Sequence, residues 1–310
     1  MKKVGFIYDD IFLQHAMPAG HPESAERLIQ IIEGLKESGL WDKLIHISPR
    51  RAPEEDILAV HTKGYFEKIK NFTGYFDPDT YVSEKSFEAA RFAAGAVIEA
   101  VDRCKKGETN SVFCAVRPPG HHAEADGAMG FCIFNNVAVG ARYAQKIGYR
   151  KIFIVDFDVH HGNGTQHIFE EDDSVFYFST HQYPHYPGTG RDTDRGKGKG
   201  EGCTYNIAMH SGSGDKDYIF AYRDILPRLV KDFRPDIILV SAGYDIHVSD
   251  PLSSIYVTKE GMTQIVRGIL LRSTATYMPS LPYVFVLEGG YDLHALRESV
   301  AITVAELLRE

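Results

Sequence analysis

The segment 151–166, KIFIVDFDVHHGNGTQ, constrains the fold of this chain more than any other. It begins with the uncharged, β-branched and aromatic run 152–155, which is typical of a strand that is buried on both faces. Strands of this kind belong to parallel sheets that helices cover on either side. Directly after this run, the segment brings several polar residues close together: Asp156, Asp158, His160, His161 and Asn163.

The spacing of these acids and histidines indicates a metal site. Residues two apart in an extended chain point to the same side, so Asp156, Asp158 and His160 would share one face. Carboxylate and imidazole groups that meet at one point suit zinc or ferrous iron. The alternative is a solvated strand end where acids and histidines meet by chance. Gly162 and Gly164, where the chain must turn tightly, favour the metal site.

The overall composition is that of a globular protein without a membrane span. Of the 310 residues, 44% are hydrophobic and 25% are charged, which are ordinary values. The longest apolar runs, 237–242 and 283–287, are far shorter than the roughly eighteen residues that a bilayer span requires. The apolar run within residues 1–8 is short and meets Asp9 and Asp10, so we expect no secretory signal there. We therefore expect a cytoplasmic protein that makes no membrane contact.

The net charge, the cysteines and one Gly/Lys-rich run argue against further kinds of partner and binding site. A net charge of −8 argues against nucleic acid as a partner and mildly favours cationic partners. The four cysteines show no C-x-x-C spacing, so we expect small buried hydrophobic residues instead of a cysteine zinc site or disulfides. The Gly/Lys-rich run 192–202 satisfies no phosphate-binding motif, and we expect a flexible surface loop there.

Strands and helices alternate along the sequence, which predicts a single α/β domain over residues 1–310. Its central sheet would be mostly parallel, with helices on both faces. Strands are predicted at 3–8, 111–116, 152–155, 175–179, 236–242 and 283–287. Helices are predicted at 24–37, 54–70, 86–104, 136–146, 216–233, 259–272 and 292–308. Ligands bind beyond the carboxyl ends of the strands in such sheets, and polar residues follow four of these strands.

A third metal ligand is expected from another of these strand ends. Catalytic zinc commonly has three protein ligands and an open position for water or substrate, so Asp158 and His160 need a partner. Asp245, which follows the strand predicted at 236–242, is the candidate. The alternative for Asp245 is a carboxylate that caps a helix or a turn.

Residues for proton transfer and charge stabilisation follow the other two strands. In the segment 117–122, RPPGHH, two prolines and a glycine fix the backbone that presents His121 and His122. This pair can supply a general base and a general acid. Tyr291, after two glycines, could place its hydroxyl where negative charge develops on a carbonyl oxygen, or it could belong to a structural turn.

Two residues outside these motifs have two interpretations each. Phe131 is either a core residue or a pocket wall near the histidine pair. Arg27 lies in the first turn of the helix predicted at 24–37, where its charge opposes the helix dipole. It is therefore either solvated or aimed at another group.

Several segments together resemble the histone deacetylase superfamily, nearest its class II and bacterial histone deacetylase-like amidohydrolases, which are related to acetylpolyamine amidohydrolases. The matching segments are RPPGHH (117–122), GFCIFNN (130–136), DFDVHHGNGT (156–165), PGTG (187–190), SAGYD (241–245) and LEGGYDL (287–293). They extend over nearly the whole chain in the family's order. The resemblance implies the arginase/deacetylase fold and hydrolysis of an N-acetyl amide to acetate and a free amine.

The resemblance also implies roles for the polar residues. The zinc ligands, which could hold ferrous iron in the cell, would be Asp158, His160 and Asp245. His122 would be the general base and acid, while His121 assists electrostatically and Tyr291 hydrogen-bonds the carbonyl oxygen. Asp156 would orient His121 and, together with the hydroxyl of Ser179, would help to hold a structural potassium ion.

By the same resemblance, the substrate site would comprise Arg27, Asp79, Gly130, Phe131, Tyr186 and Leu252. Phe131 and Tyr186 would form the walls of an acyl-lysine tunnel. Asp79 would accept a hydrogen bond from the substrate at the rim, and Arg27 would line an inner product channel.

Two positions distinguish subgroups of the family. Asn163 stands where class I members carry an aspartate, so the charge of its histidine partner would be tuned as in class II. Leu252 stands where a polyamine-selective relative has a glutamate gate. An apolar residue there leaves a polyamine without a counter-ion, which favours acetyl-lysine in peptides or proteins over acetylated polyamines.

Two other classes remain as alternatives. A ureohydrolase of the arginase type has the same fold but needs two manganese ions bridged by further aspartates, whereas this sequence shows one compact ligand set. An inactive acyl-lysine binding module would keep the pocket without turnover, but the histidine pair and Tyr291 argue against it. The sequence leaves the acyl-chain preference and the oligomeric state open.

Overall fold

A parallel sheet forms the centre of the computed structural model, which describes residues 3–272 and 281–309. Every neighbouring pair of strands runs parallel. Among the described residues the sheet contains eight strands, in the order β2 (Ile45–Ile47), β1 (Val4–Ile7), β5 (Ser111–Cys114), β10 (Tyr283–Leu287), β9 (Ile237–Ala242), β6 (Ile152–Asp156), β7 (Val175–Gln182) and β8 (Thr204–Met209). The predicted α/β fold is confirmed, and the sheet is parallel throughout.

The central strands are apolar because helices cover both of their faces. Every residue of β6, β9 and β10 is buried. The edge strand β2 differs, since two of its three residues are exposed. The sheet therefore has a dry centre and more polar edges, which are open to solvent.

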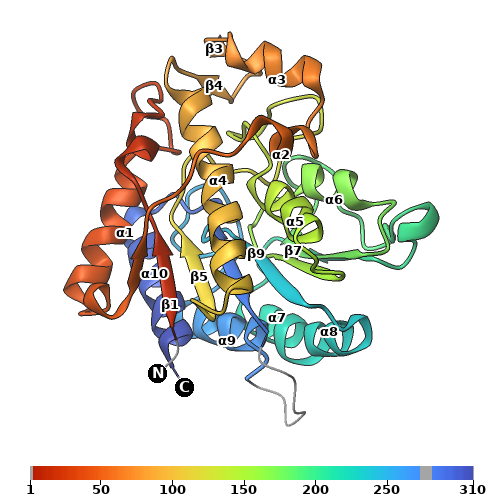
Figure 1. Cartoon of the computed structure of the whole chain (residues 1–310). Coiled ribbons are helices and arrows are strands. Elements are labelled where there is room, and N and C mark those ends of the chain that lie inside the picture. The colour runs from red at the N-terminus through yellow and green to blue at the C-terminus, as the bar shows by residue number, and fades with distance from the viewer. Residues whose placement is uncertain (1–2, 273–280, 310) are drawn as a thin grey trace.

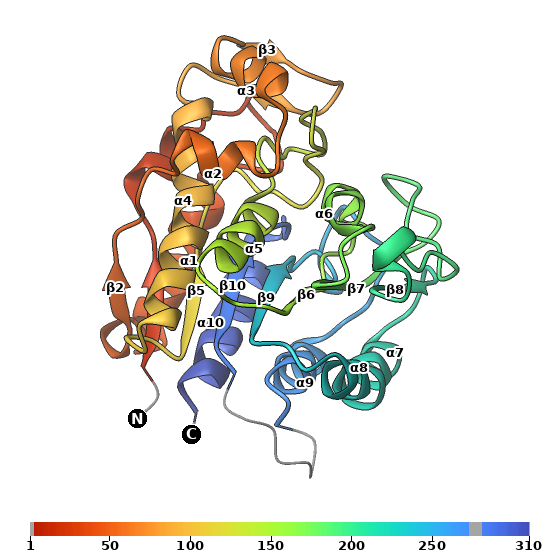
Figure 2. The same ribbon diagram turned by 45° about the vertical axis from the view of Figure 1, so that its right-hand side comes forward.

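Helices pack on both sides of this sheet. On one face, α4 (Ser86–Lys105) packs on β5 and α5 (Asn136–Lys146) packs on β6 (Figure 1). Elsewhere α1 (Glu26–Glu37) packs on α10 (Leu293–Leu308), which packs on α9 (Lys259–Ile269) (Figure 2). The other α-helices of the described chain are α2 (Glu54–Leu58), α3 (Lys63–Lys70), α6 (Asn163–Phe169), α7 (Asp215–Phe220) and α8 (Leu226–Phe233).

Two predicted helices are interrupted. The helix predicted at 54–70 is divided into α2 and α3, because Thr62 adopts an extended conformation and caps α3 by accepting a hydrogen bond from the Tyr65 amide. The helix predicted at 216–233 contains a π-helical turn at Ala221–Ile225 between α7 and α8.

Several short elements were not predicted. The edge strands β2 and β8, the hairpin formed by β3 (Gly74–Tyr75) and β4 (Tyr81–Val82), and the helix α6 escaped the sequence analysis. Helix α6 begins inside the polar motif at Asn163, so its apolar period was obscured.

The loop expected at 192–202 is tied to the body of the protein. The amide of Lys197 donates to the carbonyl of Glu170 at 2.5 Å, and within the loop the amide of Gly202 donates to the carbonyl of Arg195 at 2.7 Å. As expected, the cysteines form no disulfide; three are buried, and Cys203 is half-buried.

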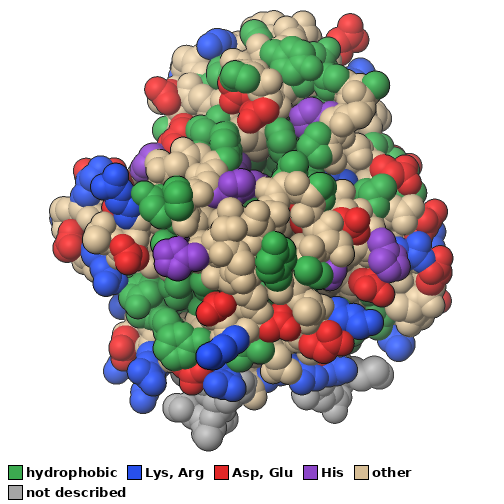
Figure 3. Space-filling view, turned by 180° about the vertical axis from the view of Figure 1, so that it is seen from behind, with side chains coloured by type: hydrophobic (Ala, Val, Ile, Leu, Met, Phe, Trp, Pro, Cys, Tyr) green, Lys and Arg blue, Asp and Glu red, His purple; other side chains and the backbone are tan. Residues whose placement is uncertain are grey.

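In the described part of the chain, no helix combines the length and apolarity needed to cross a membrane. Acidic and basic side chains are interspersed on the face seen in Figure 3.

Candidate metal centre and active site

The polar strand ends converge because their strands are neighbours in the sheet. The order β5, β10, β9, β6 places four carboxyl ends side by side, although β9 and β10 come last in the chain. The crevice beyond such ends is the usual ligand site of parallel sheets. The segments that follow these four strands contain the residues that sequence analysis singled out for metal binding and catalysis.

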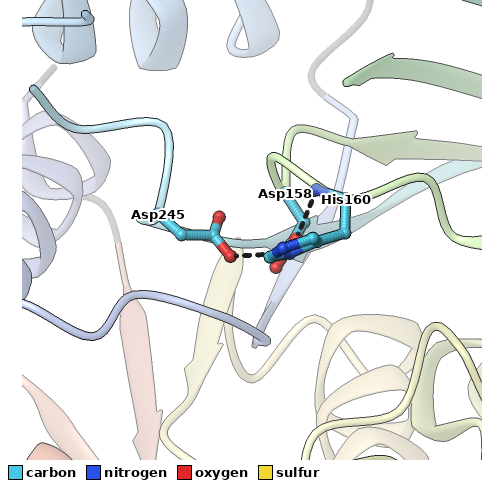
Figure 4. Close-up of side chains that lie close together, drawn as sticks. All are labelled: Asp158, His160 and Asp245. Carbon is cyan, nitrogen blue, oxygen red and sulfur yellow. Dashed lines mark hydrogen bonds and ion pairs between the residues drawn. The ribbon is translucent and has the colours of Figure 1, made fainter. Parts of the chain in front are cut away.

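Three buried side chains point toward one another at this edge. Asp158 and His160 follow β6 and Asp245 follows β9, and one potential ligand atom of each lies within 4.8 Å of the others (Figure 4). The Nδ1 atom of His160 is 3.0 Å from Oδ1 of Asp158 and 3.2 Å from Oδ2 of Asp245. Oδ2 of Asp245 is buried without a hydrogen bond. Such an oxygen is available to a cation.

The pKa values in this cluster indicate surplus negative charge. Burial raises the pKa of Asp245 to about 7, and the charge of Asp158 adds to the effect. Burial favours the neutral form of His160, but the adjacent carboxylates of Asp158 and Asp245 outweigh burial and raise its pKa to about 10. Protons bound to these side chains therefore balance the surplus negative charge. A divalent cation bound at the same point would balance this charge in place of the protons.

The backbone around the cluster orients both carboxylates. The amide of Gly289 donates to Oδ2 of Asp158 at 2.8 Å, and the amide of Val159 donates to Oδ1 of Asp245 at 2.9 Å. A Cβ atom on Gly289 would lie only 2.1 Å from Oδ2 of Asp245, so this close approach requires glycine. Two oriented carboxylates and one imidazole fit an ion such as zinc or ferrous iron.

The neighbouring histidine pair has two different hydrogen-bond partners. The rings of His121 and His122 lie 4.0 Å apart. Nδ1 of His121 is 3.1 Å from Oδ2 of Asp156, which also accepts from the Tyr177 hydroxyl at 3.0 Å. Nδ1 of His122 is 2.7 Å from Oδ1 of Asn163. A carboxyl group thus stands behind the first histidine and a neutral amide behind the second.

The pKa values of the two histidines are shifted in opposite directions. Burial favours neutral His121, but the charges of Asp158 and Asp156 outweigh it and raise the pKa to about 10. Burial lowers the pKa of His122, and the positive charges of His121 and His160 lower it further. One member of the pair is therefore a cation at neutral pH while the other is a free base, which separates an electrostatic role from a proton-accepting role.

Aromatic rings surround the centre. The ring of Phe131 lies 5.9 Å from that of Tyr291, and the ring of Tyr186 lies 5.2 Å from that of His122. Phe131 has a φ of 68°, which is strained for an aromatic residue, and its amide is held by Oγ1 of Thr80 at 3.1 Å. Gly130 must remain small, because a Cβ atom there would lie 2.4 Å from the His122 ring.

Asp79 and Leu252 lie in two loops around these rings. The half-buried Asp79 accepts a hydrogen bond from the Thr80 hydroxyl at 3.1 Å. Burial raises the pKa of Asp79, and a hydrogen bond with Asp77 adds to this. Leu252 is half-buried, and its carbonyl lies 3.0 Å from Nε2 of His185, whose ring stacks on His160. The Leu252 loop is thus connected to the metal cluster.

Arg27 is fully buried, so its interpretation as a solvated residue is wrong. Its Nε donates to the carbonyl of Gly290 at 2.8 Å, and its guanidinium lies 5.2 Å from the centre of the Tyr291 ring. The residue fixes the loop after β10 against α1. Ser179 is also buried, on β7 beside Asp156 of β6, with its hydroxyl 2.8 Å from Nδ1 of His181.

Sequence analysis did not single out Glu288, which anchors the histidine pair. Its carboxylate accepts hydrogen bonds from the amides of Gly120 and His121 at 2.6 and 3.1 Å, and from the Ser241 hydroxyl at 3.0 Å. An acid directly after the buried strand β10 is the one signal that could have revealed it. Thr80 and Glu124 were also missed; Glu124 follows His122 by two residues, which is a local signal, whereas nothing in the sequence around Thr80 places it at the site.

Comparison with known proteins assigns the family. The histone deacetylase domain family matches residues 21–307, so this chain belongs to the histone deacetylase family. A probable deacetylase of Archaeoglobus fulgidus is 38% identical over 294 residues, which cover 93% of this chain and 81% of that protein. A probable deacetylase of Methanothermobacter thermautotrophicus is 42% identical over 288 residues, covering 90% and 83% of the two chains.

Two further comparisons concern substrate and fold. The human polyamine deacetylase HDAC10 is 38% identical over 305 residues, which cover 92% of this chain and 44% of that protein. The crystal structure of the HDA15 HD domain superposes with a TM-score of 0.92 at 36% identity, covering 99% of this chain and 91% of that one. Family membership supports a hydrolase of the deacetylase type.

Proposed function

We propose that this deacetylase is a metal-dependent amidohydrolase that releases acetate from N-acetyl-lysine in peptides or proteins, with zinc at the Asp158–His160–Asp245 cluster. The observation that carries the proposal is the orphaned oxygen of Asp245 in a buried acid-rich cluster, beside a histidine pair. We also propose that residues 1–310 form one catalytic domain, which acts in the cytoplasm.

When bound, zinc or ferrous iron would polarise the acetyl carbonyl and acidify a water molecule. His122 is a neutral base at neutral pH, so it can take a proton from the attacking water and return it to the departing amine. His121 holds a positive charge beside the developing negative charge. Burial, together with the charges of Asp245 and Asp158, raises the pKa of Tyr291, so the phenol keeps its proton and can donate to the oxyanion.

The remaining site residues would bind the substrate and stabilise the centre. The rings of Phe131 and Tyr186 fit the apolar stem of an acyl-lysine, and Asp79 would accept a hydrogen bond from the substrate at the rim. Arg27 would line the channel through which acetate leaves. Asp156 and Ser179 would contribute to a structural potassium site on β6 and β7.

An acetylated polyamine is the second candidate substrate, because one relative is a polyamine deacetylase. A polyamine has a cationic backbone, which a gate carboxylate would recognise. Leu252 is apolar, so it provides no counter-ion for this charge. We therefore expect a preference for acetyl-lysine peptides.

The test is a panel of acetyl-lysine peptides, longer acyl-lysine peptides and acetylated polyamines, each assayed for acid release with zinc and with ferrous iron. Acetyl-lysine peptides should have the highest kcat/KM, and Leu252→Glu should shift the preference toward polyamines. A wild-type preference for polyamines would refute the substrate assignment. Metal-loaded protein that releases no acid from any substrate would support the binding-module alternative.

A further inference from the structure

We infer that Glu124 is a positioning residue that fixes the proton of His122 on Nδ1, acting through the side-chain amide of Asn163. The inference rests on the proposed function, because it concerns the base of that reaction. Glu124 touches neither the metal cluster nor the aromatic rings, and its carboxylate is about one-quarter exposed. It acts from outside the site.

A continuous chain of hydrogen bonds leads from His122 to the surface. Oδ1 of Asn163 lies 2.7 Å from Nδ1 of His122, and Nδ2 of Asn163 lies 2.5 Å from Oε1 of Glu124. The same oxygen of Glu124 is 2.8 Å from Nδ1 of His167, whose side chain is 43% exposed. The chain thus links a buried base to solvent through three side chains.

The packing of α6 keeps this chain in register. Asn163 is the first residue of α6, and the amide of Thr165 in its first turn donates to the carbonyl of His121 at 3.2 Å. Gly164 lies so close to the segment that a Cβ atom there would be 2.2 Å from the carbonyl oxygen of Ala123. The segment containing the histidine pair and Glu124 therefore lies directly against the start of α6.

The acceptors around Asn163 decide which way its amide points. An amide nitrogen only donates, and here it faces two oxygen acceptors: the Glu124 carboxylate and the carbonyl of His122 at 3.2 Å. Oδ1 must then face His122. Because an amide oxygen only accepts, Nδ1 of His122 must carry the hydrogen, and Nε2 is left with the lone pair.

Without the Glu124 carboxylate, the main acceptor for the Asn163 amide nitrogen is lost. A flipped amide would present its nitrogen to Nδ1 of His122, and this nitrogen would then have to accept. The proton would move to Nε2, which could no longer take a proton from water. Glu124 therefore determines whether His122 is a competent base.

Three variants separate this role from a merely structural one. Glu124→Leu removes the acceptor and should lower kcat about 10- to 100-fold, as loss of such an outer partner does, with KM and metal content nearly unchanged. Glu124→Gln keeps an acceptor oxygen and should retain most of kcat. Glu170→Leu is the matched control, because it removes a nearby acid that pairs with Lys197 and does not contact Asn163.

A second test uses a background in which Glu124→Gln should raise kcat. In an Asn163→Asp background two carboxylates would face each other, so Glu124→Gln should raise kcat there by supplying a donor amide. A drop in kcat in that background would contradict the inference. So would equal activities of Glu124→Leu and Glu124→Gln, and so would a Glu124→Leu enzyme with wild-type kcat.

The deciding measurement does not depend on turnover. Nitrogen-15 NMR of histidine-labelled protein distinguishes the two tautomers, and the His122 signals are assigned by their absence from His122→Ala. Wild type and Glu124→Gln should show the Nδ1–H form, and Glu124→Leu a mixture or the Nε2–H form. If the chain releases no acid from any substrate, this result still stands. An unchanged Nδ1–H form in folded Glu124→Leu would overturn the role of Glu124.

Discussion

Two buried charged clusters in this protein balance their charges in opposite ways. At the metal centre, two carboxylates share one imidazole, and Oδ2 of Asp245 has no hydrogen bond. Around the fully buried Glu23, the chain supplies the cations itself. Arg117 forms hydrogen bonds with both Glu23 oxygens, one of them at 2.8 Å, and Arg27 lies 3.3 Å from Oε1.

The pKa values record this difference. Burial acts on both acids in the same direction, and at Asp245 it raises the pKa to about 7. At Glu23, the charge of Arg117 and the adjacent His15 overcome burial and hold the pKa well below its ordinary value. Burial of an acid alone thus does not identify a metal site. A metal site is indicated where buried acids lack protein cations that balance their charge.

Removal of a ligand should have the largest effect. Asp245→Ala should abolish both stoichiometric zinc and turnover, because only two ligands would remain. Zinc content per chain and acid release are the measurements. Asp250→Ala, which removes a nearby buried acid outside the cluster, is the control and should retain the metal. Stoichiometric zinc in Asp245→Ala would remove this residue from the ligand set.

A substitution in the cluster around Glu23 should change the free energy of unfolding. Glu23→Gln leaves Arg117 buried without its charge partner and should cost about 3–5 kcal/mol. Denaturant unfolding of the metal-free protein measures this cost. Glu88→Gln breaks an exposed pair with Arg51 and should cost under about 1 kcal/mol. Equal costs for the two variants would erase the distinction between the clusters.

The pH dependence of this stability has a definite sign. Because the pKa of Glu23 is depressed in the folded protein, its contribution is present above the ordinary value of 4.5 and is lost as the pH falls below it. Wild type should therefore lose more stability on acidification than Glu23→Gln.

Loss of the Tyr291 hydroxyl, one hydrogen-bond donor at the metal centre, should cost slightly less free energy than Glu23→Gln does. Tyr291→Phe should lower kcat about 100- to 1000-fold, as removal of one oxyanion donor does, while the zinc content stays close to that of the wild type. Steady-state kinetics and metal analysis together test this. Near-normal turnover would exclude the Tyr291 hydroxyl from the mechanism.

Metal removal should lower the stability less than Glu23→Gln does. An ion that binds only the folded state at 100 times its Kd stabilises that state by about 2.7 kcal/mol. A chelator should therefore lower the Tm of the wild type but leave that of Asp245→Ala unchanged. An equal shift in both proteins would mean that the chelator acts elsewhere.

Much of the fold could be predicted because the central strands are buried on both faces. Runs such as 152–155 and 283–287 are apolar at every position, and the polar residues that follow them stand out. The short edge strands β2 and β8 lack this signal, since one face or one end of each meets solvent.

The parts of the site that escaped prediction depend on contacts between distant segments. Arg27 contacts residues more than 250 positions away, and its burial follows from the packing of α1 on α10. Thr80, whose hydroxyl accepts from the Phe131 amide, reaches the site from a loop whose local sequence is ordinary. Only the assembled sheet brings such residues to the ligands.

The strand order has a consequence for how the protein is made. β5 and β6 follow each other along the chain, yet the last two strands, β9 and β10, lie between them in the sheet. A chain still emerging from the ribosome can therefore hold His121, Asp158 and His160 but lacks the two strands that place His121 beside the other two. The centre of the sheet closes only after synthesis has passed residue 287, so a half-made chain should neither capture metal nor begin catalysis.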